Sequence, residues 1–302
     1  MKHPTNHERS QFFAYTENKF YICILIIPAE CPRKAGGIFH TQGKNSVLNV
    51  FAIPALQDNY IWCIRQLGQA ACIIVDPGEA APVMQALANN DLKCVAVFIT
   101  HHHGDHSNGA AELAAHYSIP VYGPAYSKLA VVTHPLADQD RININELDAQ
   151  FQVLAIPGHT LDHIAYFCEG LLFCGDTLFS AGCGRAFEGT PAQLYQSLVK
   201  LMQLPADTFV YCGHEYTLKN LRFAKMIEPH NVAIDHYLQQ VEDLRAKNQI
   251  TLPSQLQLEK AVNPFLRVGQ PEVQSFVTEQ LGHAPIDAIE IFSVLRQLKD
   301  RF

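Results

Sequence analysis

Short apolar runs separated by turn residues dominate the chain between residues 48 and 212. β-Branched and aromatic residues fill most of these runs, which is typical of buried strands bounded by Gly, Pro, Asn or Asp. The first series of expected strands covers 48–53, 60–66, 71–75, 94–99 and 120–123, and the second covers 151–156, 163–168, 171–174 and 209–212.

Helical spacing of apolar residues appears between the strands and takes over after about residue 216. We expect helices at 82–89, 110–116, 191–204, 218–227, 234–247, 270–280 and 287–301. Two series of strands that carry helices predict an α/β domain of two sheets packed face to face, with helices outside. From about residue 216 to the end of the chain, the change from strand to helical periodicity predicts an all-α tail.

Residues 1–47 do not share this pattern. A polar, basic start leads to the apolar run 20–27, which is far shorter than the roughly 20 residues of a membrane helix. It also lacks the short leader and the A-x-A exit of a signal peptide. We expect an N-terminal extension, 1–47, that is disordered or not translated, before a folded part that begins at Leu48.

Composition narrows the class of protein. The 302 residues are 48% hydrophobic and carry a formal net charge of −7, which argues against a nucleic-acid or anionic-membrane partner. The nine cysteines form no C-x-x-C pair, so we expect reduced thiols and a cytoplasmic protein.

Candidate chemistry gathers where strands end. The segment 100–106, THHHGDH, follows the strand 94–99 and precedes the helix 110–116, so it lies at the carboxyl end of a strand. Imidazole and carboxylate are ligands for zinc, iron or manganese. His101 and His103 can face one ion while Asp105 and His106 reach a second. A solvated polar turn is the alternative for this segment on its own.

Three later strand ends also carry a ligand-type residue. His159, Asp176 and His214 each follow a glycine that permits a tight turn. Each alone could be a core histidine or a turn aspartate, but four such strand ends together favour a metal site.

These residues resemble the signature of the metallo-β-lactamase superfamily. The resemblance implies an αββα sandwich with two metal ions. His101, His103 and His159 would hold the first ion, Asp105, His106 and His214 the second, and Asp176 would bridge them. The ions would be divalent, with zinc expected first and iron or manganese as alternatives.

Within the superfamily the chain is similar to the glyoxalase II family of hydroxyacylglutathione hydrolases. The similarity runs from Leu48 to the last residue and implies a catalytic domain, 48–215, and a helical substrate-binding domain, 216–302. Asp162 departs from the family's expected glycine, and Arg185 and Phe187 stand where some members have lysine and tyrosine. The matching stretches are Ile53–Trp62, Gly175–Phe179, Gly182–Arg185, Phe187–Thr190, Cys212–Thr217, Asn263–Arg267 and Leu295–Phe302.

The resemblance implies hydrolysis of S-(2-hydroxyacyl)glutathione, such as S-D-lactoylglutathione, to glutathione and D-lactate, the second step of methylglyoxal detoxification. A hydroxide that bridges the ions would attack the thioester, with Asp105 and Asp176 as catalytic residues. The substrate-binding residues implied are Arg185, Phe187, Tyr216, Arg296 and Lys299. We expect a monomer whose partner is this small molecule.

Other hypotheses remain open at this stage. A persulfide dioxygenase of the same fold would use one iron and O₂, and a metal store or sensor would not turn over substrate. Cys174 or Cys183 could act as a nucleophile, although neither has an obvious activating base and we expect both to be structural. Arg296 and Lys299 share a helix face near solvent, where such cations also simply complement the helix dipole.

Overall fold

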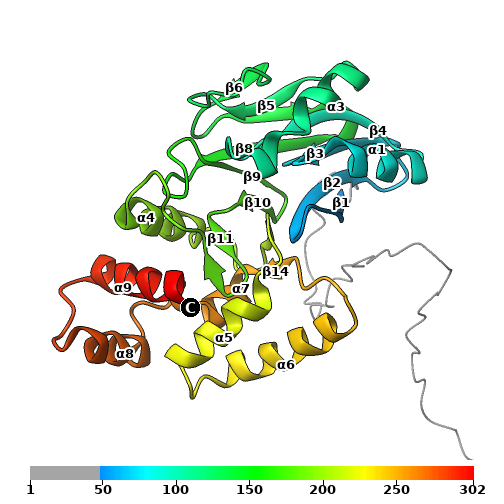
Figure 1. Cartoon of the computed structure of the whole chain (residues 1–302). Helices are drawn as coiled ribbons and strands as arrows, with labels where there is room; N and C mark the ends of the chain where they lie inside the picture. Colours follow the sequence, from blue (N-terminus) through cyan, green and yellow to red (C-terminus); the bar gives the residue numbers. More distant parts are fainter. Residues whose placement is uncertain (1–47) are drawn as a thin grey trace, which may run out of the picture. The chain divides into compact units, whose positions relative to one another are not determined.

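The computed structural model describes residues 48–302, and the expected extension 1–47 lies outside the described residues. Two six-stranded sheets form the centre of the described part (Figure 1). The first contains, in spatial order, β1 (Leu48–Ala55), β2 (Asn59–Gln66), β3 (Ala71–Val75), β4 (Lys93–Phe98), β5 (Val121–Pro124) and β6 (His134–Leu136). The second contains β14 (Ser254–Gln255), β13 (Phe209–Cys212), β10 (Leu171–Gly175), β9 (Ile164–Cys168), β8 (Ala149–Ala155) and β7 (Arg141–Ile144).

Both sheets are mixed. In the first sheet β1, β2 and β3 pair antiparallel, and β3, β4, β5 and β6 pair parallel. In the second sheet only the β10–β13 pair is parallel. A two-stranded ribbon, β11 (Leu178–Phe179) with β12 (Gly182–Cys183), follows β10.

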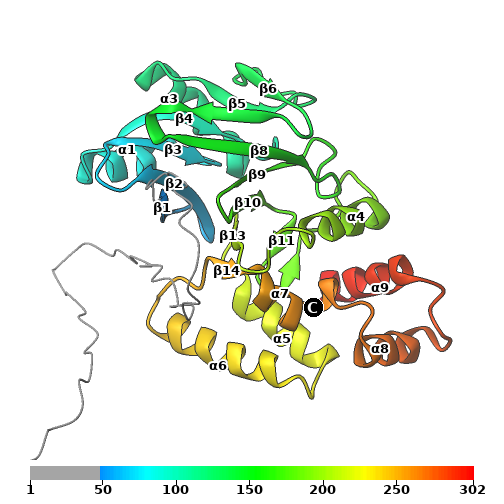
Figure 2. The same ribbon diagram turned by 180° about the vertical axis from the view of Figure 1, so that it is seen from behind.

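Helices cover the outer faces of the sheets and form the tail. α1 (Ala80–Asn89) and α3 (Ala110–Tyr117) share a buried cluster with the outer face of the first sheet (Figures 1 and 2). α4 (Pro191–Leu201) packs on the second sheet, and the one-turn α2 (Gly104–Ser107) carries part of the histidine segment. The tail comprises α5 (Thr217–Ile227), α6 (Val232–Ala246), α7 (Leu256–Val262), α8 (Pro271–Leu281) and α9 (Ala288–Arg301), and 3₁₀ turns lie at η1 (Asn145–Leu147) and η2 (Pro264–Leu266).

The core lies between the sheets, because strands such as β2 are apolar on both faces. Trp62 and Ile64 point into the core between the sheets, and Ile61 and Cys63 pack under α1 and α3. Burial on both faces explains why these strands read as continuous apolar runs rather than alternating ones. The Trp62 indole donates a hydrogen bond to the carbonyl of Cys212 at 2.9 Å and so joins the two sheets.

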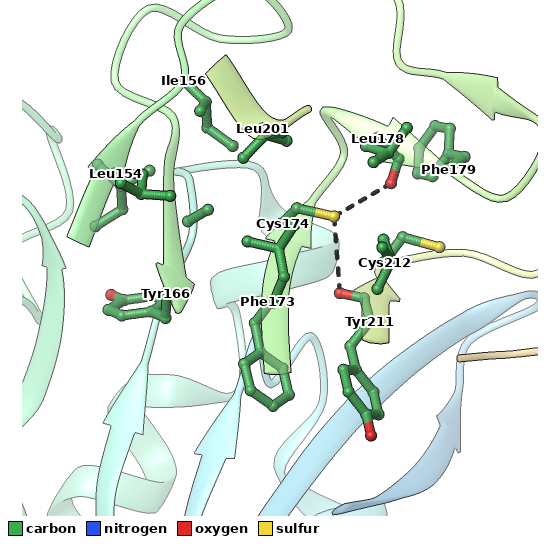
Figure 3. Packing of buried hydrophobic residues seen from close by; sticks show 14 of the residues in the cluster. Leu154, Ile156, Tyr166, Phe173, Cys174, Leu178, Phe179, Leu201, Tyr211 and Cys212 are labelled. Atoms are coloured by element: carbon green, nitrogen blue, oxygen red, sulfur yellow. Dashed lines mark hydrogen bonds between the residues drawn. The ribbon is translucent and has the colours of Figure 1, made fainter. Parts of the chain in front are cut away.

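The second sheet packs on its other face against α4. Figure 3 shows Cys174 among Leu178, Leu201 and Cys212, with Phe173 and Tyr211 on the face toward the first sheet. The Cys174 thiol donates to the carbonyl of Leu178 at 3.2 Å, so it fills the core as a small apolar group with a weak donor.

Every strand and helix expected from the sequence is present, with ends shifted by at most three residues. The sequence did not predict β6, β7 and α7, which are short and lie at edges or between turns. The helical tail also contributes β14, which pairs antiparallel with β13 and extends the second sheet. None of the described helices is long and apolar enough to cross a membrane.

We expect Phe98→Ala to destabilise the fold by about 3–5 kcal/mol, the usual loss for a fully buried phenylalanine. Phe98 is 0% exposed and stacks on Tyr166 with ring centroids 4.5 Å apart. Urea unfolding at fixed metal concentration measures the change. Leu67→Ala is the control, because Leu67 is 54% exposed and should change little. A loss below 1 kcal/mol for Phe98→Ala would contradict the tight packing of this ring between the sheets.

Candidate metal centre

The four strand ends expected to carry ligands meet at one edge of the sandwich. The segment after β4 brings His101 and His103, the loop after β8 brings His159, and the ends of β10 and β13 bring Asp176 and His214. Every metal-binding residue expected from the sequence therefore lies in one cluster. The distances within it fall into two sets joined by one carboxylate.

The first set consists of three imidazole nitrogens. Nδ1 of His103 lies 3.1 Å from Nε2 of His101 and 3.1 Å from Nε2 of His159. A neutral imidazole has only one N–H, so three converging nitrogens cannot satisfy one another well by hydrogen bonds. Ligands at about 2.0–2.1 Å from a tetrahedral ion lie about 3.3 Å apart, which is close to the spacing observed.

The second set has the same spacing. Oδ2 of Asp105 lies 3.4 Å from Nε2 of His106 and 3.3 Å from Nε2 of His214. The Asn59 side chain donates to the same carboxylate oxygen at 3.0 Å and fixes its direction.

Asp176 faces both sets. Its Oδ1 lies 3.3 Å from Nε2 of His106, and its Oδ2 lies 3.5 Å from Nε2 of His159 and 3.2 Å from Nε2 of His214. Among the described residues, Nε2 of His106 and Oδ1 of Asp176 are buried without a hydrogen-bond partner. Buried polar atoms of this kind are costly unless something else satisfies them. Cations would do so, and the residues fit two metal ions.

Burial and neighbouring charges shift the pKa values of the histidines differently in the two sets. Burial lowers the pKa of His101, His103 and His159, which keeps these rings neutral as ligation requires. Burial also acts to lower the pKa of His214, but the carboxylates of Asp176 and Asp105 outweigh it and raise this pKa to about 10. A cation in the second set would therefore displace a proton, and its affinity should fall in acid.

Contacts behind the rings aim the ligating nitrogens inward. Nδ1 of His106 lies 3.0 Å from Oδ2 of Asp76, and Nδ1 of His214 lies 2.8 Å from Oδ1 of Asp58. Nδ1 of His159 donates to the carbonyl of Arg185 at 2.8 Å. Such outer contacts fix the tautomer, leaving Nε2 free for the metal.

The roles of Asp58 and Asp76 were not predicted from the sequence. The available signal for Asp76 was its position directly after β3, the neighbour of β4 in the sheet. Asp76 also accepts hydrogen bonds from the amide and hydroxyl of Thr100, both at 2.7 Å, so it ties two strand ends together.

Glycine is required at two of the strand ends. A Cβ on Gly213 would lie 2.5 Å from Cε1 of His106 and 2.6 Å from Oδ1 of Asp176. Gly175 has a φ of +47°, and a Cβ there would meet Oγ1 of Thr100 at 2.3 Å. The glycine before each of these ligands allows the strand end to approach the centre closely.

A cavity of about 390 Å³ opens beside the cluster, with His159 and Asp176 in its wall. The substrate-binding residues that the resemblance implies all line it: Arg185, Phe187, Tyr216, Arg296 and Lys299. The Tyr216 ring stacks on that of His214 at 4.7 Å, and the Phe187 ring lies 5.2 Å from that of His159.

Arg296 and Lys299, the two cations of α9 expected near solvent, are in fact buried. Arg296 is 6% exposed and Lys299 is 9% exposed. Arg296 donates to the carbonyls of Cys183 and Gly184 at 2.7 and 3.3 Å and to Asp300 at 3.0 Å. The helix turns this face toward the β12 loop because Leu295 and Phe292 beside it enter the core.

The described cysteines have no sign of a catalytic role. Among residues 48–302 all seven are free and buried. Burial raises the pKa of the Cys183 thiol to about 11, and it raises the pKa of Cys174 as well. A thiolate is the nucleophilic form, so neither residue is prepared to attack a substrate.

Comparison with known proteins agrees with this geometry. A model of the metallo-beta-lactamase superfamily matches residues 57–214, and a model of the hydroxyacylglutathione hydrolase C-terminus matches residues 215–302. A protein named hydroxyacylglutathione hydrolase from Erwinia tasmaniensis is 49% identical over 256 residues, which cover 84% of this chain and 100% of the relative. The chain belongs to the hydroxyacylglutathione hydrolase family.

Other members of the family give the same result. Proteins with that name from Shewanella baltica and Nitrosomonas eutropha are 47% and 44% identical, each covering 85% of this chain and 100% of the relative. Among solved structures, ETHE1 from Myxococcus xanthus has a TM-score of 0.57 at 24% identity and covers 84% of this chain and 98% of its own. The BLEG-1 B3 metallo-beta-lactamase has a TM-score of 0.56 at 22% identity, covering 72% and 99%. At these identities the two structures show the shared fold alone.

We expect Asp76→Asn to weaken metal binding by about 10- to 100-fold, because the amide no longer fixes the His106 tautomer. Competition with a chromophoric chelator measures the affinity. Asp91→Asn is a matched control: Asp91 has the same φ of +52° as Asp76 but lies exposed and away from the cluster. Equal affinities for the two variants would rule out the orienting role of Asp76.

Proposed function

We propose that this chain hydrolyses S-(2-hydroxyacyl)glutathione thioesters, with S-D-lactoylglutathione as the substrate that its family name suggests. The products would be glutathione and D-lactate. The observation that supports this most directly is one cavity whose wall contains His159 and Asp176 of the ligand sets together with the buried cations Arg296 and Lys299. A substrate with a scissile thioester and distant carboxylates suits such a cavity.

In this proposal His101, His103, His159 and Asp176 hold one divalent ion, and Asp105, His106, His214 and Asp176 hold the other, with zinc in both sites. When bound, two such ions activate water at neutral pH and polarise a carbonyl oxygen. The chain's own residues keep the reacting end in place: Asp176 spans the sets, and Asn59 holds Asp105. The leaving thiol has a pKa near 8.5, so its thiolate departs without a strong general acid.

Lys299 is the best candidate for a substrate carboxylate. Asp300 already pairs with both arginines of the cavity, lying 3.2 Å from Nε of Arg185 and 3.0 Å from Nη2 of Arg296. Lys299 has no carboxylate within 4.0 Å among the described residues and donates only to the carbonyl of Lys219, at 3.2 Å. Burial, aided by the charge of Arg296, lowers its pKa to about 7. The ammonium lies over the rings of Phe223 and Phe302 at 5.1 and 5.0 Å, and an incoming carboxylate would give it the ion pair that it lacks among the described residues.

The proposal assigns separate tasks to the two parts of the chain. Residues 48–215 would hold the ions and the thioester, and residues 216–302 would bind glutathione through Tyr216 and α9. Phe187, 62% exposed, would cover the thioester end of the cavity.

Metal analysis combined with an assay of S-D-lactoylglutathione hydrolysis tests the function. We expect two metal ions per chain and thioester hydrolysis that Asp176→Ala abolishes together with most of the bound metal. One iron per chain with oxygen uptake on a glutathione persulfide would replace this proposal with the dioxygenase hypothesis. Bound metal with neither activity would favour a store or sensor.

We expect Lys299→Met to raise KM about 5- to 30-fold with little change in kcat, because a contact far from the bond binds ground and transition states alike. This equals about 1–2 kcal/mol, the range for a charged hydrogen bond that is partly shielded. Lys93→Met, at an exposed position of β4, is the control. A fall in kcat at constant KM would instead make Lys299 a structural residue.

The pH dependence of kcat/KM should follow the protonation of Lys299. Lys299 binds an anion only while protonated, so affinity is highest below its pKa of about 7 and is lost as the pH rises through that value. We expect kcat/KM to fall up to about tenfold between pH 6 and pH 8, since this ratio reports groups of the free enzyme. Lys299→Arg should flatten this limb, because arginine stays charged. An unchanged profile in that variant would exclude Lys299 as the source.

A further inference from the structure

A second group of metal-type ligands lies outside the two sets described above. His102, Asp162 and Glu188 offer one imidazole and two carboxylates whose ligand atoms all lie within 4.8 Å of one another. They line a separate cavity of about 550 Å³, together with Tyr126, Lys128 and Leu161. The ring nitrogens of His102 contact Asp162 and Glu188, although its neighbours His101 and His103 belong to the first ligand set.

His102 contacts both carboxylates of the group. Its Nδ1 lies 3.0 Å from Oδ1 of Asp162, and its Nε2 lies 3.3 Å from Oε1 of Glu188. No lysine or arginine nitrogen of the described residues lies within 4.0 Å of either carboxylate, although Lys128 lines the same cavity.

Asp162 supplies the sign of a missing ligand. Its side chain is 6% exposed, and its Oδ1 already accepts a hydrogen bond from Thr160 at 2.7 Å. Its Oδ2 is buried and has no hydrogen-bond partner among the described residues. A buried carboxylate oxygen without a donor is costly, and a cation is the partner that removes the cost most completely.

We propose that His102, Asp162 and Glu188 form a third cation site, which takes a divalent ion such as Zn²⁺ and is separate from the two-ion centre. One imidazole and two carboxylates are ligands that zinc accepts, with water completing the coordination. The site is open, since the side chains of His102 and Glu188 are 31% and 38% exposed, so it binds more weakly than the buried sets.

The third ion would join the two loops that flank the catalytic cavity. Glu188 accepts a hydrogen bond from the amide of Leu161 at 2.9 Å, which links the 184–190 loop to the loop of His159. Phe187, next to Glu188, lies over the rings of His103 and His159. A cation held by Glu188 would therefore hold the residue that covers the thioester end of the cavity.

Stepwise Zn²⁺ titration of the full chain by equilibrium dialysis tests the site without any substrate, so its outcome is independent of the proposed thioester hydrolysis. We expect the wild-type chain to bind one equivalent more than Asp162→Asn, which keeps the Thr160 hydrogen bond but loses the charge. Glu188→Gln should lose the same equivalent, and Glu112→Gln, an exposed carboxylate of α3, should not.

The two tightly bound equivalents provide the internal reference. The proposal is overturned if the wild-type chain stops at two equivalents or if Asp162→Asn binds as many as the wild type. It is also overturned if Asp162→Asn loses the tight equivalents as well, because the cluster would then only support the two-ion centre. Anomalous scattering at the zinc edge should place the third ion between His102 and Glu188 in the wild type and show no peak there in Asp162→Asn.

Discussion

The carboxylate of Asp176 is the contact on which the whole site depends. It is buried and faces ring nitrogens from three different strand ends at 3.2–3.5 Å. Burial alone would raise its pKa, but the imidazoles of His106 and His214 lower it well below the usual range, so the group is ionised. A buried negative charge needs compensation, and the geometry around it leaves that role to cations rather than to hydrogen-bond donors. The turns at Gly175 and Gly213 allow this carboxylate and the rings to approach one another closely.

Much of this could be predicted from the sequence, because both signals are local. Apolar runs such as 71–75 and 94–99 predict buried strands whatever surrounds them, and THHHGDH stands out as a ligand segment by residue type alone. The roles of Asp58 and Asp76 could not be predicted in this way, since each depends on which strand lies beside which. The burial of Arg296 was missed for a related reason: helical spacing gives a shared face, but not what that face packs against.

Charge is distributed so that an acidic chain presents a basic cavity. The net charge is −7, yet Arg185, Arg296, Lys219 and Lys299 all line the cavity. Asp300 holds the two arginines in place and reduces their attraction for an anion, while the burial of Lys299 keeps one cation unpaired. Selectivity for an anionic substrate then depends on which cations have no carboxylate partner in the free protein. A buried cation without such a partner gains more from a substrate carboxylate than a cation that is already paired.

The core and the metal centre are connected directly by hydrogen bonds between the two sheets. Trp62 donates to the carbonyl of Cys212, only two residues before the ligand His214, and the amide of Tyr60 donates to the carbonyl of Gly213 at 2.8 Å. The first sheet therefore holds the strand end of the second sheet that delivers a ligand. Since bound ions stabilise only the folded chain, their binding free energy adds to the stability of this same contact between the sheets. A residue such as Phe98, which is not itself a ligand, thus helps to set the spacing of the ligand sets, because loosening the sandwich moves the strand ends that carry them.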